Sequence, residues 1–337
     1  MTLKRFYAIF KARNIEFLRD KAALGWNFFF PVLLVVGFAF VFSGDGRSMY
    51  KVGLMGEQSS EFSQTKYIQF IDYQTSHSAM DKVMLKLQQH SLDLLIDNDR
   101  KVYWINETSP KGYIVEKLLL QVEPGFTRQV TQGKEVRYVD FVLPGILGMN
   151  MMFSCLFGVG YVVVRYRKNS VLKRLQATPL HAAEFLCAQV FSRLLIVMGT
   201  VTIIYLGCNL FFDFYMIGSY LQLLLIAALG ALAMISMGLV VAARSESEEL
   251  VGGMLNMLSW PMMVLSGVWF SLEGAPEFIQ TMAQFLPLTH LVDAARSIMT
   301  NGDTLWDLKY NVLSLLAMTV CFTSIGAWMF RWESEGR

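Results

Sequence analysis

Hydrophobic residues in this chain gather into long stretches that contain no charged side chain. Such stretches cover residues 22–44, 141–164, 194–212, 214–243, 250–272 and 310–330. Each is long enough to cross the roughly 30 Å hydrocarbon core of a bilayer as a helix. Charged residues make up only 17% of the chain, whereas soluble domains carry about a quarter. The pattern predicts an all-α polytopic membrane protein with six transmembrane helices, the first over residues 24–43.

A polar region of a different kind separates the first stretch from the second. Residues 44–140 contain no apolar run long enough to span a membrane. Segments rich in β-branched and aromatic residues alternate there with segments whose apolar residues recur at helical spacing. The predicted strands are Lys51–Met55, Tyr67–Tyr73, Leu92–Ile96 and Val102–Ile105, and the predicted helices are Ala79–Gln89 and Tyr113–Val122. This alternation indicates a small α/β domain inserted between spans one and two.

Residues 1–23 predict an amphipathic helix that lies at the membrane interface. Its apolar residues fall near one face of the helix, and basic residues cover the other. The basic residues are Lys4, Arg5, Lys11, Arg13, Arg19 and Lys21. A helix with one apolar and one cationic face suits the headgroup boundary, where anionic lipids attract the cations. Membrane lipids are therefore expected partners.

The region between the last two stretches does not fit a simple crossing. Its apolar part, Phe278–Val292, has only 15 residues; Pro276 precedes it and Pro287 divides it. That length is typical of re-entrant or interfacial helices, so residues 273–300 are predicted to form an outer re-entrant segment. The candidate outer gate consists of Pro276, Pro287, His290, Asp293 and Arg296. A satisfied hydrogen-bond network at the outer interface is the alternative interpretation of the polar members.

A strongly basic segment, Arg165–Leu180, joins the second stretch to the third. Its basic residues are Arg165, Arg167, Lys168, Lys173 and Arg174. Leu172 and Leu175 recur at helical spacing, Ser170 is a suitable N-cap, and Pro179 ends the pattern. We expect an amphipathic helix over residues 165–180. A charged loop that only fixes topology is the alternative.

Basic residues in the short loops indicate the orientation in the membrane. Residues 1–24 hold six Lys and Arg, the loop over 165–184 holds five, and the short loop at Asp213 holds none. Short basic loops stay in the cytoplasm, whereas long domains cross regardless of charge. Both termini and residues 165–180 are therefore predicted to be cytoplasmic, and the 44–140 domain extracytoplasmic.

Motifs of common enzymes are absent from the sequence. It contains no G-x-x-x-x-G-K-[ST] phosphate loop, no H-E-x-x-H and no G-x-S-x-G. The four histidines and four cysteines show no metal-ligand spacing. We expect no enzyme activity and no cofactor in this chain itself, and nothing in the pattern indicates a nucleic-acid partner.

Polar residues are scarce within the predicted spans. Arg193 is the main ionisable residue among them. A charged residue within a span usually indicates a functional site. The long side chain of arginine can instead extend to the lipid headgroups, and we expect this for Arg193. Candidate pathway-lining residues are Asn150, Met151, Asn209 and Asn256, because Met-rich surfaces repack around varied apolar ligands. Ordinary helix packing is the alternative.

Four short motifs follow one another along the chain in a defined order. They are Arg19-Asp20 before Pro31; Phe141-Val-Leu-Pro-Gly-Ile; Leu172-Lys-Arg-Leu-Gln-Ala-Thr-Pro-Leu180; and Ser266-Gly-Val-Trp-Phe with Pro276 and Pro287-Leu-Thr-His-Leu-Val-Asp-Ala-Ala-Arg296. Together they resemble the permease subunit of type-2 ATP-binding-cassette (ABC) exporters over nearly the whole chain. One place departs from that family: Asn169, Ser170 and Val171 stand where it usually has an acidic residue and Gly-Thr.

The resemblance implies a mechanism that depends on other subunits. Two permeases would pair as a homo- or heterodimer, and cytoplasmic ABC ATPase subunits would hold ATP and Mg and bind the inner face. Leu172 and Leu175 would fill a groove on the ATPase, while Lys173 and Arg174 would pair with its acidic residues. The implied coupling residues are Leu172, Lys173, Arg174, Leu175, Thr178 and Pro179.

The resemblance also implies the substrate class and the location. A hydrophobic or amphipathic substrate, drug- or lipid-like, would leave through the bacterial inner membrane, with a periplasmic adaptor as a further partner. Within transport, an ion or polysaccharide exporter is the alternative. A scaffold that does not transport, whose outer domain binds an envelope partner, is a different class. The re-entrant prolines favour transport, because a pure anchor needs no broken helix.

Overall fold

The computed structural model divides the chain into two compact units. Met1–Ala39 and Val139–Arg337 form one, which we call the helical unit, and Phe40–Tyr138 form the other, which we call the α/β unit. The structure describes residues 3–41, 50–56, 62, 68–73, 77–133, 135–178, 181–243, 245, 247–269, 272 and 276–330.

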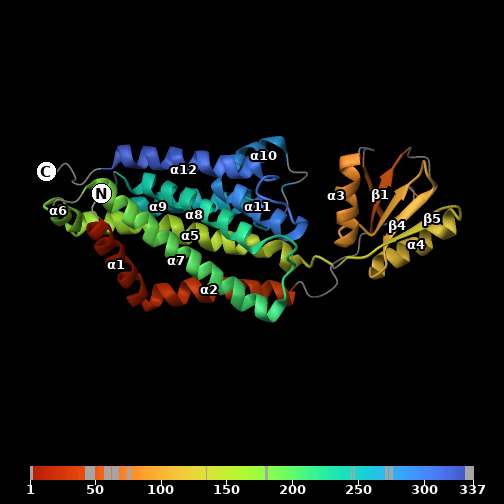
Figure 1. Cartoon of the computed structure of the whole chain (residues 1–337), viewed down its shortest axis with the longest axis horizontal. Coiled ribbons are helices and arrows are strands. Elements are labelled where there is room, and N and C mark those ends of the chain that lie inside the picture. Colours follow the sequence, from red (N-terminus) through yellow and green to blue (C-terminus); the bar gives the residue numbers. More distant parts are fainter. Residues whose placement is uncertain are drawn as a thin grey trace. The chain divides into compact units, whose positions relative to one another are not determined.

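The α/β unit contains one mixed sheet with a helix on each face (Figure 1). Its elements are β1 (Tyr50–Met55), β2 (Ile68–Asp72), α3 (His77–Gln88), β3 (Leu94–Asp97), β4 (Val102–Asn106), α4 (Pro110–Val122) and β5 (Thr127–Thr131). The strand order is β2-β1-β3-β4-β5. Only β3 and β4 pair antiparallel, and the other neighbours are parallel.

Alternation along the strands separates the core of the α/β unit into two clusters. Val52 and Leu54 of β1 pack with α4 on one face, and Met55 of the same strand packs with α3 on the other. Successive side chains of a strand point to opposite faces, which explains this division. Tyr103 of β4 donates to the carboxylate of Glu116 over 2.7 Å, and burial together with this contact raises the pKa of Tyr103 to about 12.

The helical unit is built from helices of very different lengths. They are α1 (Leu3–Arg19), α2 (Lys21–Val41), α5 (Tyr138–Lys168), α6 (Val171–Gln176), α7 (Ala182–Phe212), α8 (Tyr220–Ala242), α9 (Glu248–Leu265), α10 (Glu277–Gln284), α11 (Pro287–Asn301) and α12 (Lys309–Met329). Among the described residues, four helices are long and apolar enough to cross a membrane: α5, α7, α8 and α12. These helices fit a polytopic membrane protein.

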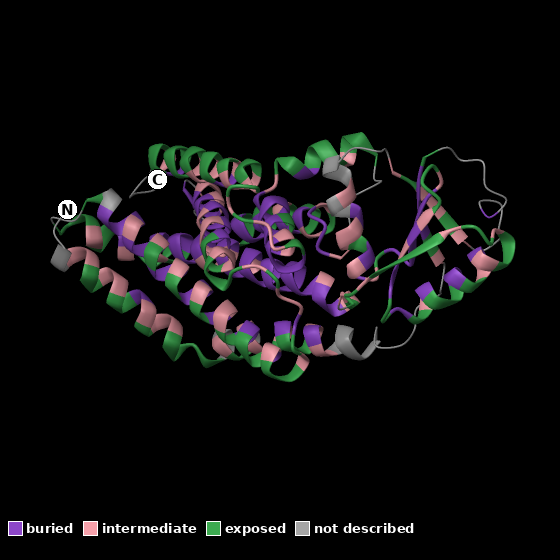
Figure 2. Ribbon diagram, turned by 45° about the vertical axis from the view of Figure 1, so that its right-hand side comes forward, coloured by how far each residue is buried: buried purple, intermediate pink, exposed green. Residues whose placement is uncertain are grey.

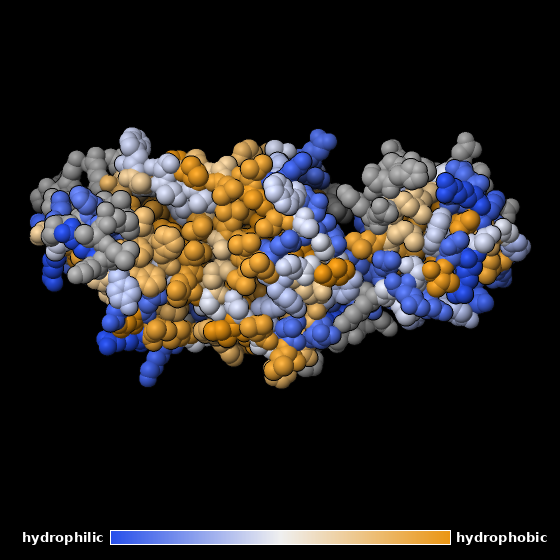
Figure 3. All heavy atoms as spheres, viewed as in Figure 1, coloured by the Kyte–Doolittle hydropathy of each residue, from blue (hydrophilic) through white to orange (hydrophobic). Residues whose placement is uncertain are grey.

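The helices that carry the other two predicted spans differ from these four. In α2 the described apolar helix is Asn27–Val36. The helix α9 begins with Glu248 and Glu249 and contains Asn256 and Pro261, which lower its mean hydropathy. The surface of the helical unit nevertheless carries hydrophobic side chains along its middle (Figure 3).

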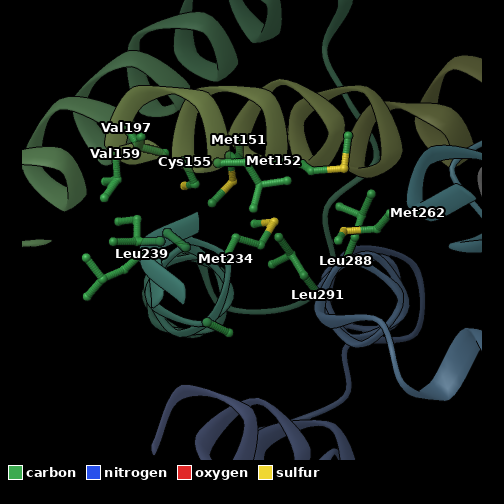
Figure 4. Close-up of a cluster of buried hydrophobic side chains, with 14 of the residues drawn as sticks. Met151, Met152, Cys155, Val159, Val197, Met234, Leu239, Met262, Leu288 and Leu291 are labelled. Carbon is green, nitrogen blue, oxygen red and sulfur yellow. The ribbon is translucent and has the colours of Figure 1, made fainter. Parts of the chain in front are cut away.

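The helix α5 lies at the centre of the helical unit. Its residues Met151, Met152 and Cys155 point toward side chains of α8 and α11, among them Met234 and Leu291 (Figure 4). Buried residues concentrate on these central helices, whereas α12 is largely exposed (Figure 2). The four long apolar helices therefore differ in burial, and α5 is the most buried of them and α12 the least.

Close packing of α5 against α8 depends on a glycine. A Cβ at Gly238 of α8 would lie 2.9 Å from the carbonyl oxygen of Leu156 in α5, which is closer than side chains approach one another. Small residues at such positions let helix backbones come together in membrane proteins.

The two ends of the helical unit hold different elements. The beginning of α1, the helix α6 and the end of α12 lie at one end, which we call the α6 end (Figure 1). The helices α10 and α11 lie at the opposite end, which we call the α10–α11 end. Neither α10 nor α11 runs the length of the unit.

Candidate functional site

The predicted helix over residues 165–180, which contains the implied coupling residues, is divided between two helices in the structure. Arg165, Arg167 and Lys168 belong to the last turn of α5, and α6 covers only Val171–Gln176. Ser170 lies between them with a left-handed φ of 56°, and its side chain makes no capping hydrogen bond. The prediction that Ser170 caps the helix is therefore wrong, because the sharp reversal after α5 takes it out of the extended conformation that an N-cap needs.

The two faces of α6 serve different purposes. Leu172 is fully buried and Leu175 packs against the core of the helical unit. They hold α6 to its own chain in this structure, and the expectation that they fill a groove on the ATPase stays a prediction. Lys173, Arg174 and Thr178 are exposed, and Pro179 lies outside the described residues. The exposed cations are the part of α6 that a partner can reach.

Arg167 joins the end of α5 to the end of α8. Its Nη1 donates to the carbonyl of Ala242 over 3.1 Å and also to that of Ser245, and its Nη2 donates to the carbonyl of Ala243 over 2.8 Å. The last carbonyls of a helix have no partner within the helix and carry partial negative charge. Arg167 thus has a structural role that its place in a basic cluster did not indicate.

Arg13 holds α1 against α5 instead of facing lipid headgroups. It is only 8% exposed; its Nη1 lies 2.9 Å from the carboxylate of Glu16, and its Nη2 donates to the carbonyl of Gly158 over 3.2 Å. The hydroxyl of Tyr166 donates to Glu16 over 2.5 Å. The assignment of Arg13 to the cationic face is therefore wrong. Glu16, the acidic residue one helical turn after Arg13, is the signal that could have indicated this pairing.

Arg193 of α7 also points into the protein, so the expectation that it snorkels is wrong. It is 7% exposed. Its Nε donates to the carbonyl of Ser154 over 2.6 Å, and its Nη2 donates to the hydroxyl of Ser154 over 2.7 Å. A Cβ at Gly158 would overlap the guanidinium. Two small residues of α5, one turn apart, therefore make room for this cation.

A cavity of about 450 Å³ lies beside these two arginines. We call it the α1–α5 cavity. Its lining residues come from α1, α2, α5, α7 and α9 and from the junction of α1 with α2. They are Arg13, Glu16, Phe17, Asp20, Asn27, Phe153, Ser154, Phe157, Gly158, Tyr161, Val162, Arg165, Arg193 and Asn256. The cavity therefore combines ionic groups with a wall of aromatic rings.

Of the predicted pathway residues, Asn256 lines this cavity and the other three lie elsewhere. Asn150 is buried and donates to the carbonyl of Asn27 over 3.1 Å. Met151 belongs to the hydrophobic core. The side chain of Asn209 accepts from the backbone N–H of Phe214 over 3.0 Å and closes the turn after α7. In the described structure these three residues have packing and turn-forming contacts.

The predicted outer residues tie α11 to several neighbours. His290 Nε2 donates to the carbonyl of Gln284 in α10 over 2.8 Å. Arg296 donates to the carbonyls of Phe141 and Gly267, over 3.2 and 2.9 Å. Asp293 is exposed and 4.0 Å from Arg296. Together these contacts form a hydrogen-bond network around α11.

The two outer prolines mark helix starts. Pro276, which is exposed, precedes α10, and Pro287, which is buried, opens α11. Proline suits the first helical position because its missing N–H would have no partner there. Residues 273–275 of the predicted segment lie outside the described part of the chain.

No group of three His, Cys, Asp or Glu side chains that could hold a metal ion occurs among the described residues. The thiols of Cys155 and Cys208 are buried, and Cys321 is exposed on α12.

Comparisons with known proteins identify the family. A model of the ABC-2 type transporter family matches residues 4–300. The Linearmycin resistance permease protein LnrN of Bacillus subtilis (strain 168) is 25% identical over 209 residues, which cover 60% of this chain and 52% of LnrN. The Probable multidrug ABC transporter permease YbhS of Escherichia coli (strain K12) is 24% identical over 186 residues, which cover 55% of this chain and 49% of YbhS.

A third relative gives the same result. The Inner membrane transport permease YhhJ of Escherichia coli (strain K12) is 24% identical over 188 residues, which cover 54% of this chain and 49% of YhhJ. The chain thus spans about half the length of these three curated relatives. Since the family model covers most of the sequence, this protein belongs to the ABC-2 type transporter family, as a transport permease.

Proposed function

We propose that this permease exports a hydrophobic or amphipathic substrate and is driven by ATP hydrolysis on a separate cytoplasmic ATPase subunit. ABC-2 permeases generally work with such a subunit. The observation that carries the proposal is the position of α6. It is a short helix anchored by buried Leu172, and it presents Lys173 and Arg174 outward.

Anchoring is what allows α6 to pass on a movement. A push on α6 reaches the core through Leu172 and Leu175, and the preceding helix α5 is fixed to α8 by Arg167. Exposed cations suit acidic side chains of a partner, since charged pairs steer and orient protein association. A movement of the ATPase would therefore shift α5 and α8 together.

The proposed topology has six spans, with both termini and α6 in the cytoplasm and the α/β unit outside. Support comes from the helical unit, where the beginning of α1, the helix α6 and the end of α12 share one end. The basic residues of the short loops gather in the same segments. We assign α2 and α9 as the two further spans.

The proposed active form is a dimer of permeases. The helix α9 supports this, because one of its faces carries large exposed apolar side chains at helical spacing. They are Leu250, Met254, Met257, Trp260 and Val264. A second copy or a paralogue would cover this face, and lipid would cover it in a monomer.

The proposed substrate class has two supports. The names of LnrN and YbhS refer to linearmycin resistance and to multidrug transport. For this chain, the aromatic wall of the α1–α5 cavity supports an apolar or amphipathic ligand. An ion pump would need acidic relays within its spans, and the uncharged stretches of this sequence provide none.

The test is a charge reversal on α6. We expect the double variant Lys173→Glu/Arg174→Glu to assemble and insert but to lose coupling between ATP hydrolysis and transport. Purified complexes in nanodiscs would be assayed for ATP hydrolysis with and without candidate substrates. The matched control, Lys173→Arg/Arg174→Lys, keeps both charges and should retain coupling.

Two results would contradict the proposal. Substrate-stimulated hydrolysis in the reversed variant equal to that of the parent would remove α6 as the coupling contact. Failure of the parent protein to co-purify with any ATPase, together with binding of an envelope protein to the α/β unit, would favour the scaffold instead.

A further inference from the structure

The ionic groups that line the α1–α5 cavity do not balance. Three arginines and two carboxylates line it, so three positive charges against two negative ones leave one positive charge. Arg13 is paired with Glu16 over 2.9 Å. Arg193 pairs with no carboxylate among the residues that the structure describes; its contacts are Ser154 and the ring of Phe17, 5.6 Å away.

An enclosed cation of this kind favours an anion from outside the chain. Burying a charge without a partner costs free energy that a counter-charge recovers. A guanidinium has five N–H donors in a planar fork, and the hydrogen bonds of Arg193 to described residues use only Nε and Nη2. Nη1 donates to none of the described residues. A carboxylate or phosphate oxygen is the acceptor that fits such a fork.

Beside this cation, the cavity offers an apolar wall. The rings of Phe153 and Phe157 lie 5.9 Å apart, and those of Phe157 and Tyr161 lie 5.5 Å apart. All three residues line the cavity, and Phe17 of α1 lines it as well. Successive rings along one helix form a surface for a hydrocarbon chain. The volume of about 450 Å³ suits a headgroup and the first part of its chain.

We propose that the α1–α5 cavity binds an anionic amphiphile, with the acid group on Arg193 and the hydrocarbon chain along Phe153 and Phe157. The proposal names a ligand class, an acidic headgroup on an apolar chain. Two sources could supply it: a resident membrane phospholipid, or the transported substrate. The second source rests on the proposed function, and the first does not.

Two glycines provide a test that keeps the charge of Arg193. A side chain at Gly158 would overlap the guanidinium, so Gly158→Ala should displace it. A Cβ at Gly199, on α7 like Arg193, would meet nothing within 4 Å. Gly199→Ala is therefore the matched control. Arg193→Gln removes the charge itself, and a thermal melt of each variant reports whether it folds.

The first experiment measures lipid binding to the permease and does not depend on ATP hydrolysis. The protein is placed in nanodiscs of phosphatidylcholine containing a minority of phosphatidylglycerol, and retained lipid is identified by native mass spectrometry. We expect the parent and Gly199→Ala to retain phosphatidylglycerol selectively. Gly158→Ala and Arg193→Gln should retain it about tenfold less, the loss expected for one charge-assisted contact. Equal retention by all four proteins, or no preference for the anionic lipid in the parent, would overturn the proposal.

A second arm distinguishes the two sources. Dodecyl phosphate is added to the complex with its ATPase in phosphatidylcholine nanodiscs, with neutral dodecyl maltoside for comparison. If dodecyl phosphate stimulates hydrolysis in the parent and not in Gly158→Ala, the site takes a substrate. If it binds through Arg193 without stimulation, the site holds a resident lipid; both results support the proposal. The charge reversal on α6 tests the proposed function in a separate experiment. The lipid-binding result can therefore be interpreted even if that test contradicts the proposed function.

Discussion

The two ends of the helical unit are fastened in the same way and differ in what they expose. At the α6 end, Arg167 donates to the last carbonyls of α8. At the α10–α11 end, Arg296 donates to the carbonyls of Phe141 and Gly267. At the α6 end, the short helix α6 adds two exposed neighbouring cations, Lys173 and Arg174. The comparison separates arginines that fasten helices from cations that are available to a partner.

Arg193, beside the α1–α5 cavity, differs from both of these arginines. Arg167 and Arg296 each donate to the backbone carbonyls of at least two residues, whereas Arg193 donates to the carbonyl and hydroxyl of one residue, Ser154, beside a cavity. A guanidinium bound to several carbonyls is part of the framework. One that retains donors toward a cavity is a candidate receptor for an anion.

The largest expected effect comes from removing a fastening arginine. Arg167→Met and Arg296→Met should each lower the free energy of unfolding by about 3 kcal/mol, because each leaves buried carbonyls without a donor. Thermal unfolding in nanodiscs measures this loss. Arg167→Met should in addition reduce coupling of ATP hydrolysis to substrate, since it frees the end of α5 that precedes α6.

Equal coupling of ATP hydrolysis to substrate in Arg167→Met and Arg296→Met would contradict a special role for the α6 end. It would mean that the α6 end has no closer relation to the ATPase than the α10–α11 end. Arg167→Lys is the control, because a lysine keeps the charge and can satisfy one carbonyl.

An intermediate effect is expected from two tyrosines, one at each end. Tyr166 donates to the carboxylate of Glu16 over 2.5 Å in a partly buried setting, whereas Tyr310 donates to the amide oxygen of Gln284 over 3.1 Å at an exposed site. Tyr166→Phe should cost about 1.5 kcal/mol or more, and Tyr310→Phe about 0.5 kcal/mol. Thermal unfolding of the two variants measures both losses, and a larger loss for Tyr310→Phe would contradict a stabilising role for the Tyr166–Glu16 contact between α5 and α1.

The smallest effect is expected at an exposed ion pair. Lys168 and Glu248 lie 3.8 Å apart, and the lysine side chain is 59% exposed. Lys168→Ala should therefore change the free energy of unfolding by less than about 0.5 kcal/mol. Chemical or thermal unfolding measures it. A loss as large as that of Arg167→Met would show that the basic cluster acts as one structural unit.

The membrane character of the chain could be predicted from the sequence, because uncharged stretches of this length have few other uses. The distant partners of its buried cations, which lie on another helix, could not be predicted. Arg13 and Arg193 lie among basic and apolar residues in the sequence, which suggests lipid headgroups. Their partners Gly158 and Ser154 are far along the chain, and hydrophobic periodicity carries no information about such pairs.

The sequence also offered little indication of the strand β5 and of the conformation of Ser170. The edge strand β5 has the sequence TRQVT, and four of its five residues are exposed. It therefore lacks the buried alternation that identifies a strand. Ser170 has the composition of an N-cap, but the reversal after α5 determines its left-handed conformation. Coupling residues Lys173 and Arg174 stay predictions for which the exposed face of α6 provides support.

On the proposed topology, the α6 end faces the cytoplasmic ATPase and the α10–α11 end faces outward. This orientation is tested by labelling single cysteines with a membrane-impermeant maleimide in intact cells, in a background where Cys187 and Cys321 are serine. Glu277→Cys, at the start of α10, should react from outside, and Lys173→Cys should react only after permeabilisation. Labelling of Lys173→Cys in intact cells, with protection of Glu277→Cys, would contradict the account.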